Sequence, residues 1–166
     1  MVLGLSLHAF TVLHVIISIV ELLAGAILVL QMIAGNRSGL NGVFLATGAL
    51  TTLTGFLFPY HGVTPAIVLG FITLPFLLLA AVAWYTGRLR GTWRVIYVLS
   101  TLIILYFDAF VAVVQSFMKI PALHALAPEG KEPPFAVAQG LVLLLFIVVG
   151  YLALKRFRPA GVAEPA

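Results

Sequence analysis

Two acidic residues lie in the middle of long apolar segments of the sequence, where a charged side chain is costly. Glu21 belongs to the segment His8–Ala34, and Asp108 belongs to the segment Trp93–Phe117. An ionised carboxylate at the centre of a lipid bilayer costs about 2.5–3.5 kcal/mol on insertion scales. Acidic residues at that depth therefore face a bundle interior or a water-filled cavity, where they bind protons, ions or polar ligands. Glu21 and Asp108 are thus candidate acid–base residues of an intramembrane site.

Polar residues accompany both acids at helical spacing. In the first segment, offsets of 3, 4, 3 and 4 residues place one stripe on a single helix face: Thr11, His14, Ser18, Glu21 and Gly25. In the fourth segment, a second stripe contains Tyr97, Thr101, Asp108, Ala112 and Gln115. We therefore hypothesise an internal polar cavity, open toward the outer surface, with two loop histidines at its mouth. Its proposed residues are His14, Glu21, Asp108, Gln115, Gln139, His61 and His124.

Other site chemistries have weaker patterns in this sequence. His8, His61 and His124 are candidate metal ligands at the outer surface, but no two histidines have i, i+4 spacing and no HExxH motif occurs. A b-type haem requires histidines from facing helices at matched depth, and only His14 lies clearly within an apolar segment. The absence of cysteine excludes disulfides, iron–sulfur clusters and cysteine zinc sites, and no GxSxG nucleophile motif is present. The sequence thus identifies no cofactor and favours no enzyme class, while quinone or lipid binding remains open.

Five apolar segments must position these residues. Polar residues, prolines and glycines separate the segments His8–Ala34, Gly42–Phe58, Pro65–Tyr85, Trp93–Phe117 and Phe135–Leu154. Each approaches the roughly 17–25 residues that cross about 30 Å of hydrocarbon as a helix, and 63% of the chain is hydrophobic whereas 8% is charged. The sequence therefore predicts an all-α, polytopic membrane bundle of about five transmembrane helices. Residues 1–158 form its single domain, 159–166 form a short cytoplasmic tail, and a short interfacial helix is expected around Pro121–Ala127.

The basic residues fall unequally on the two sides of this bundle. One side receives Arg37, Arg88, Arg90, Arg94, Lys155, Arg156 and Arg158, and the other receives Lys119 and Lys131. The positive-inside rule then places the N-terminus outside and the C-terminus in the cytoplasm. The basic residues form no face interleaved with aromatic residues, so the net charge of +4 indicates topology and not binding of nucleic acid.

Two outer loops carry a family resemblance. The segments TGFLFPYHGVTPA (Thr54–Ala66) and Gln115–Gln139, which contains KIPALHALAP and EPPFAVAQ, are similar to those of small bacterial inner-membrane proteins that are described only as hypothetical. The resemblance covers most of the chain. It implies a bacterial source and a multi-pass location in the inner (cytoplasmic) membrane, and it implies no activity, cofactor or site residue.

Two functions from different classes fit these patterns. In the first, the protein binds or transports a small ligand, an ion or a proton at a periplasm-facing polar site that contains Glu21, Asp108 and His14. In the second, it is a structural or assembly subunit without chemistry of its own, whose polar side chains join helices, copies of the chain or a partner in a membrane complex. Small residues such as Thr51 and Gly55 are assigned to helix packing in either case. Convergence of Glu21 and Asp108 on one cavity favours the first function, and separate packing contacts or exposure to lipid favour the second.

Overall fold

The computed structural model describes residues 1–59, 62 and 65–158. Its long helices are α1 (Leu7–Ile33), α2 (Asn41–Phe56), α3 (Pro65–Tyr85), α4 (Thr92–Lys119) and α6 (Pro133–Arg156), and α5 is a single turn, Pro121–His124. The described residues contain no strand beyond an isolated bridge between Val2 and Leu5. The predicted all-α bundle is confirmed. The expected short helix after Pro121 is present, although it ends at His124 instead of Ala127.

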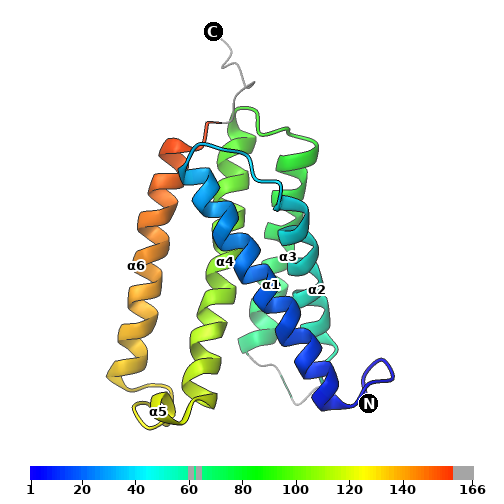
Figure 1. Ribbon diagram of the computed structural model, residues 1–166, viewed down its shortest axis with the longest axis vertical. Coiled ribbons are helices and arrows are strands. Elements are labelled where there is room, and N and C mark those ends of the chain that lie inside the picture. The colour runs from blue at the N-terminus through cyan, green and yellow to red at the C-terminus, as the bar shows by residue number, and fades with distance from the viewer. Residues whose placement is uncertain (60–61, 63–64, 159–166) are drawn as a thin grey trace.

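The five long helices lie side by side and alternate in direction (Figure 1). Helix α1 begins at the same end of the bundle as α5, and we call this the α5 end. Helices α1 and α6 finish at the opposite end, which also carries the α3–α4 loop with Arg88 and Arg90, and we call this the basic end. Helix α1 packs on α2, α2 on α3 and α3 on α4, while α6 packs against α4 and α1. Helices α1 to α4 thus surround a common interior.

Helix length decides how many crossings the fold supports. Among the described residues, α1, α3, α4 and α6 are long and apolar enough to cross a membrane. Helix α2 has 16 residues, which span about 24 Å at 1.5 Å per residue and fall short of the hydrocarbon thickness. It ends at Phe56, before the expected Phe58, because Phe58 precedes Pro59 and a residue before proline disfavours helical geometry. Four helices support a multi-pass membrane fold, and the fifth crossing stays a prediction.

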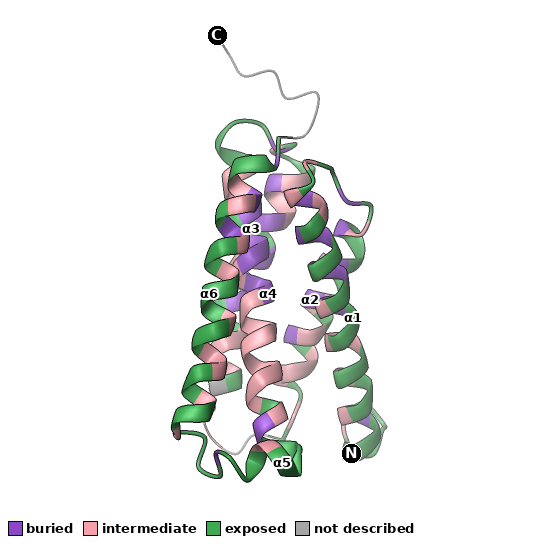
Figure 2. Cartoon of the chain, turned by 60° about the vertical axis from the view of Figure 1, so that its left-hand side comes forward, coloured by how far each residue is buried: buried purple, intermediate pink, exposed green. Residues whose placement is uncertain are grey.

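The outward faces of the helices are apolar. On α6, the side chains of Val137, Leu141, Leu144, Ile147 and Tyr151 are each more than half exposed, and Figure 2 shows exposed residues along the length of that helix. Soluble proteins rarely expose an apolar surface of this extent, whereas the hydrocarbon interior of a bilayer accommodates it. The burial pattern therefore agrees with an integral membrane protein.

The buried core lies mainly in the half of the bundle near the basic end (Figure 2). Tyr97 is fully buried, and its hydroxyl donates a hydrogen bond to Asn41 Oδ1 at 2.7 Å. Arg94 donates to the carbonyl oxygens of Leu154 and Phe157, both at 2.9 Å, and so joins α4 to the end of α6. These contacts hold α4 against α2 and α6 at the basic end. In the other half of the bundle, α1 to α4 enclose an internal space.

Candidate functional site

A cavity of about 700 Å³ lies between α1, α2, α3 and α4, in the half of the bundle near the α5 end. Its apolar wall includes Phe56, Phe58, Ile67, Phe107 and Val111. Its polar wall includes Thr11, His14, Ser18, Thr51, Asp108, Gln115 and Lys119. Ligand cavities in proteins commonly measure about 300–1,000 Å³ and combine an apolar lining with a few polar groups. The cavity therefore has the size and the lining of a small-molecule site.

Two helix faces bring the polar side chains to this cavity. Helix α1 contributes His14 and Ser18, four residues apart, and helix α4 contributes Asp108 and Gln115, seven residues apart. Residues at these spacings share one face of a helix. Three of the expected site residues, His14, Asp108 and Gln115, therefore line a single cavity.

His14 has a defined orientation at the cavity wall. Its Nδ1 is 2.7 Å from Thr54 Oγ1, and that hydroxyl donates its own proton to the carbonyl oxygen of Leu50 at 2.6 Å. Because a hydroxyl has one proton, the Thr54 oxygen is the acceptor for His14 and Nδ1 is the donor. In the neutral imidazole this leaves Nε2 without a proton and able to accept a hydrogen bond. The ring of Phe58 packs edge-on against the imidazole, with 5.2 Å between ring centres.

Glu21 and Asp108 face each other at the closed end of the cavity. Asp108 lines the cavity, while Glu21 lies behind it and is 1% exposed. The two carboxyl groups interact with each other, and a hydrogen bond between two carboxyl groups requires a proton on one of them because an ionised carboxylate only accepts. Glu21 Oε2 and Asp108 Oδ2 have no donor among the described residues. The two acids therefore lie together, as the cavity hypothesis requires.

Gly48 on α2 leaves room for the Glu21 carboxyl. A Cβ atom at Gly48 would lie 2.6 Å from Glu21 Oε1 and 2.9 Å from Leu77 Cδ2, closer than side-chain atoms approach in proteins. Thr51, one turn along α2, places its hydroxyl beside the same carboxyl, although that oxygen has no well-formed hydrogen bond among the described residues. Sequence reasoning assigned the small residues of this helix to packing alone. Only the register of α1 on α2 shows that Gly48 and Thr51 border the acid.

Two further expected site residues, Gln139 and His124, do not line this cavity. Gln139 donates from Nε2 to the carbonyl oxygen of Phe110 at 3.2 Å and joins α6 to α4. It stands apart from the cavity wall because α6 packs outside the four helices that enclose the cavity. His61 lies outside the described residues. His124 is exposed and lines a separate pocket.

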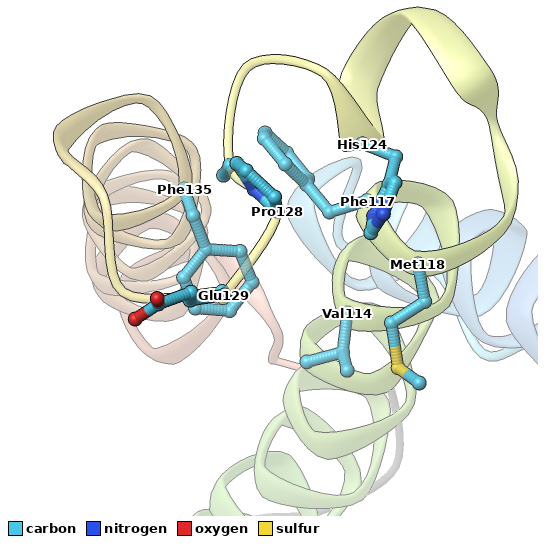
Figure 3. A pocket seen from close by; sticks show the side chains of 9 residues that line it. Val114, Phe117, Met118, His124, Pro128, Glu129 and Phe135 are labelled. Carbon is cyan, nitrogen blue, oxygen red and sulfur yellow. The ribbon is translucent and has the colours of Figure 1, made fainter.

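The second pocket measures about 350 Å³ and lies at the α5 end, between α4 and the loop that leads to α6 (Figure 3). Two of its lining residues, Phe117 and Phe135, pack edge-on, with 5.4 Å between ring centres. His124 and Glu129 border it. Among the described residues, no group of three or more histidines, cysteines, aspartates or glutamates is arranged to hold a metal ion.

Glu132 shapes the loop beside this pocket. Its carboxylate accepts hydrogen bonds from the backbone N–H groups of Glu129, at 3.0 Å, and Lys131, at 2.9 Å. These donors favour the ionised form and lower the pKa of Glu132. The contribution of Glu132 to loop stability is therefore complete above the ordinary carboxyl pKa and is lost as the pH falls through the lowered one.

No protein-family model, curated protein or solved structure matches this chain. The class of the protein therefore follows from its own fold, which is that of a multi-pass helical membrane protein with a cavity among four of its helices. The bacterial source and the inner-membrane location that the family resemblance implies stay predictions.

Proposed function

We propose that this chain is a multi-pass protein of the bacterial inner membrane that binds a small amphipathic molecule in the cavity enclosed by α1 to α4. The observation that carries the proposal is the meeting of His14, Asp108 and Gln115, from two helices, on the wall of one cavity of about 700 Å³. Polar side chains within membrane spans are costly, and those that face a cavity commonly serve a substrate, an ion or a proton.

The wall of the cavity defines the chemistry of the ligand. His14 Nε2 accepts a hydrogen bond when the ring is neutral, because Nδ1 donates to Thr54. Gln115 offers both a donor and an acceptor. Most of the remaining lining is apolar and includes the rings of Phe56 and Phe107. An apolar molecule whose polar end carries a hydroxyl or amine donor satisfies both parts of this lining.

The distribution of charge supports an orientation in which the cavity opens to the periplasm. The loops and helix end at the basic end carry Arg37, Arg88, Arg90, Arg94, Lys155, Arg156 and Arg158, whereas Lys119 and Lys131 lie toward the α5 end. The positive-inside rule assigns the basic end to the cytoplasm. The cavity, which lies toward the α5 end, then faces the periplasm.

Mass spectrometry of the protein in native lipid discs tests the proposal. The Ala112→Phe variant fills part of the cavity that Ala112 lines. The matched control is Val137→Phe, at a site on α6 that is 60% exposed. We expect a small molecule to co-purify with the wild type and with Val137→Phe and to be lost from Ala112→Phe. Identical small-molecule content in all three proteins would reject cavity binding.

The alternative function, a structural or assembly subunit, makes a different prediction for the same preparations. In that case Ala112→Phe changes no bound small molecule, and a second protein or a second copy of the chain accompanies the wild type in the discs. The polar contacts of Gln139 with α4 are of the kind that such a role uses, since they join helices without facing a cavity.

A further inference from the structure

Three polar atoms at the closed end of the cavity have no hydrogen-bond partner among the described residues. They are Glu21 Oε2, Asp108 Oδ2 and Thr51 Oγ1, and all three are buried. Buried polar atoms in proteins are nearly always paired, and unpaired ones call for a specific explanation. Glu21 itself is 1% exposed, so bulk solvent does not satisfy it. The carboxyl oxygens of Glu21 and Asp108 can therefore accept a hydrogen bond or a proton from a bound ligand.

A proton is the ligand that this arrangement fits best. Calcium takes about 6–8 oxygen ligands and magnesium requires six in near-octahedral geometry, and the five side-chain oxygens of Glu21, Asp108 and Thr51 do not by themselves complete either set. One proton shared between two facing carboxyls satisfies an oxygen on each side. It also leaves a single negative charge in the pair instead of two, which reduces the cost of burial in apolar surroundings.

The pair is reached from one side only. Asp108 lines the cavity, and the cavity continues past Ser18 and His14 toward the α5 end. One helical turn in the other direction, Gly25 on α1 is in close contact with α2 and α4. A Cβ there would lie 2.6 Å from Leu105 Cδ1 and 2.8 Å from Phe44 Cε2. This layer of Gly25, Phe44 and Leu105 has no room for an additional methyl group and separates the acids from the basic end.

We propose that the Glu21–Asp108 pair is a proton-binding site that loads and releases its proton through the cavity toward the α5 end, and that the packed layer at Gly25 closes it toward the basic end. This inference goes beyond ligand binding, since it requires the cavity as a path but no bound small molecule. A site of this kind holds a proton without conducting it across the membrane, because the second half of the path is closed.

Few charged or titratable groups surround the Glu21–Asp108 pair. On α1, His14 lines the cavity between the pair and the α5 end, and on α4, Lys119 lies at the mouth. Helix α2 presents Thr51, which is uncharged, and α3 contributes Thr73 and apolar side chains to the wall. Asp108 and Glu21 are the only acids at this depth among the described residues, and His14 is the titratable group on the cavity wall between the pair and the α5 end.

Infrared spectroscopy of the wild-type protein in lipid tests the shared proton. A protonated carboxyl has a carbonyl stretching band that is distinct from carboxylate bands and shifts in D₂O. We expect this band in the wild type at neutral pH and its loss or shift in both Glu21→Gln and Asp108→Asn. If a variant does not fold, reaction of the wild type with a hydrophobic carbodiimide, which modifies protonated carboxyls, reports on the same proton. Absence of both the band and the modification in the wild type would overturn the proposal.

Cysteine accessibility tests the sidedness, and the chain has no native cysteine to interfere. Ser18→Cys lies on the cavity wall, and Ser100→Cys is a matched substitution at a residue that is 2% exposed, on the basic side of Asp108. A small, membrane-impermeant cationic thiol reagent is applied to each face of oriented vesicles. We expect Ser18→Cys to react only from the face that carries the N-terminus and Ser100→Cys to react from neither. Reaction of Ser18→Cys from the basic end, or of Ser100→Cys from the face that carries the N-terminus, would show that the layer at Gly25 does not close the path.

The two tests separate this inference from the proposed ligand site. A protein that carries no small molecule but shows the carboxyl band and one-sided labelling retains the proton site without the ligand function. A protein that binds a small molecule but lacks the band and the carbodiimide reaction retains the ligand site alone.

Discussion

At the residue scale, the site depends on how closely α2 approaches α1. The Glu21 carboxyl occupies the space that a side chain at Gly48 would fill, since a Cβ there would lie 2.6 Å from Glu21 Oε1. Overfilling a close-packed region typically costs about 1–3 kcal/mol. Glycine within a helix is itself less favourable than alanine by about 1 kcal/mol. Glycine at position 48 therefore lowers the helix propensity of α2 slightly, but it leaves space for the Glu21 carboxyl in the interior.

Substitution of Gly48 by alanine separates the cost of overfilling this space from the gain in helix propensity. We expect Gly48→Ala to lower the free energy of unfolding by about 1–3 kcal/mol, because the added methyl group displaces the carboxyl. Gly140→Ala on α6 is the matched control, because nothing lies within 4 Å of its Cβ position. It should be neutral or stabilising by up to about 1 kcal/mol. Unfolding of both variants in the same detergent measures the difference, and equal stabilities would show that the space at Gly48 is not restricted.

At the scale of the elements, α6 is the least enclosed of the long helices and is held at particular points. Arg94 donates to the carbonyl oxygens of Leu154 and Phe157 at its end, and Gln139 donates to the carbonyl oxygen of Phe110 near its beginning. The last carbonyl groups of a helix have no partner within the helix. A guanidinium from α4 satisfies two of them and fixes the position of α6 on the bundle.

Removing this guanidinium should loosen the end of α6. A hydrogen bond to a charged group contributes about 1.5–3 kcal/mol, so we expect Arg94→Gln to lower thermal stability clearly. Arg90→Gln makes the same change in charge at an exposed position of the neighbouring loop and should have little effect. Thermal unfolding of the two variants in one detergent compares them. If Arg90→Gln were as destabilising as Arg94→Gln, the loss of charge and not the contact with α6 would be responsible.

At the scale of the whole molecule, the alternating helices place α1's beginning and α6's end at opposite ends of the bundle (Figure 1). The basic residues gather at the end where α6 finishes. If α2, with its 16 residues, crosses the bilayer together with the four longer helices, the two termini of the chain lie on opposite sides of the membrane. An arrangement in which α2 does not cross would place both termini on the same side, and it would require α1 or α6 to run in the direction opposite to that in Figure 1.

Reporter fusions distinguish these arrangements. We expect a fluorescent protein fused after Arg158 to be fluorescent in the cytoplasm, and alkaline phosphatase inserted at Gly130 or fused to the N-terminus to be active in the periplasm. Phosphatase activity at the C-terminus with fluorescence at Gly130 would reverse the orientation. Activity of one reporter type at both termini would exclude the fifth crossing.

Local patterns in the sequence predicted the helices but not their mutual register. The predicted bounds of α3 agree with the structure, α4 extends two residues beyond Phe117 to Lys119, and α6 begins two residues before Phe135. Proline at the first helical position explains the earlier start of α6, because it has no N–H to satisfy. Helical spacing also placed His14 and Asp108 on interior faces.

The parts of the site that sequence reasoning missed depend on contacts between helices. Gly48 leaves room for the Glu21 carboxyl, and Thr54 accepts a hydrogen bond from His14. The spacing of residues along α2 does not specify which residues of α1 they contact. Gln139 is among the cavity residues predicted from the sequence. Depth along a helix does not determine which neighbour a side chain faces, and α6 packs on the outer side of α4. The sequence therefore lacks the information on how neighbouring helices are aligned and rotated against one another.

The packed layer at Gly25 also has an electrical consequence. If water fills the cavity, it brings the potential of the solution at the α5 end to the depth of Asp108. A voltage across the membrane then falls mainly over the packed half of the bundle, which extends from the layer of Gly25, Phe44 and Leu105 to the basic end. Moving one elementary charge through 100 mV takes about 2.3 kcal/mol. Ionisation of Asp108 is therefore almost insensitive to voltage, whereas passage of any ion through the packed half opposes or gains nearly the full potential.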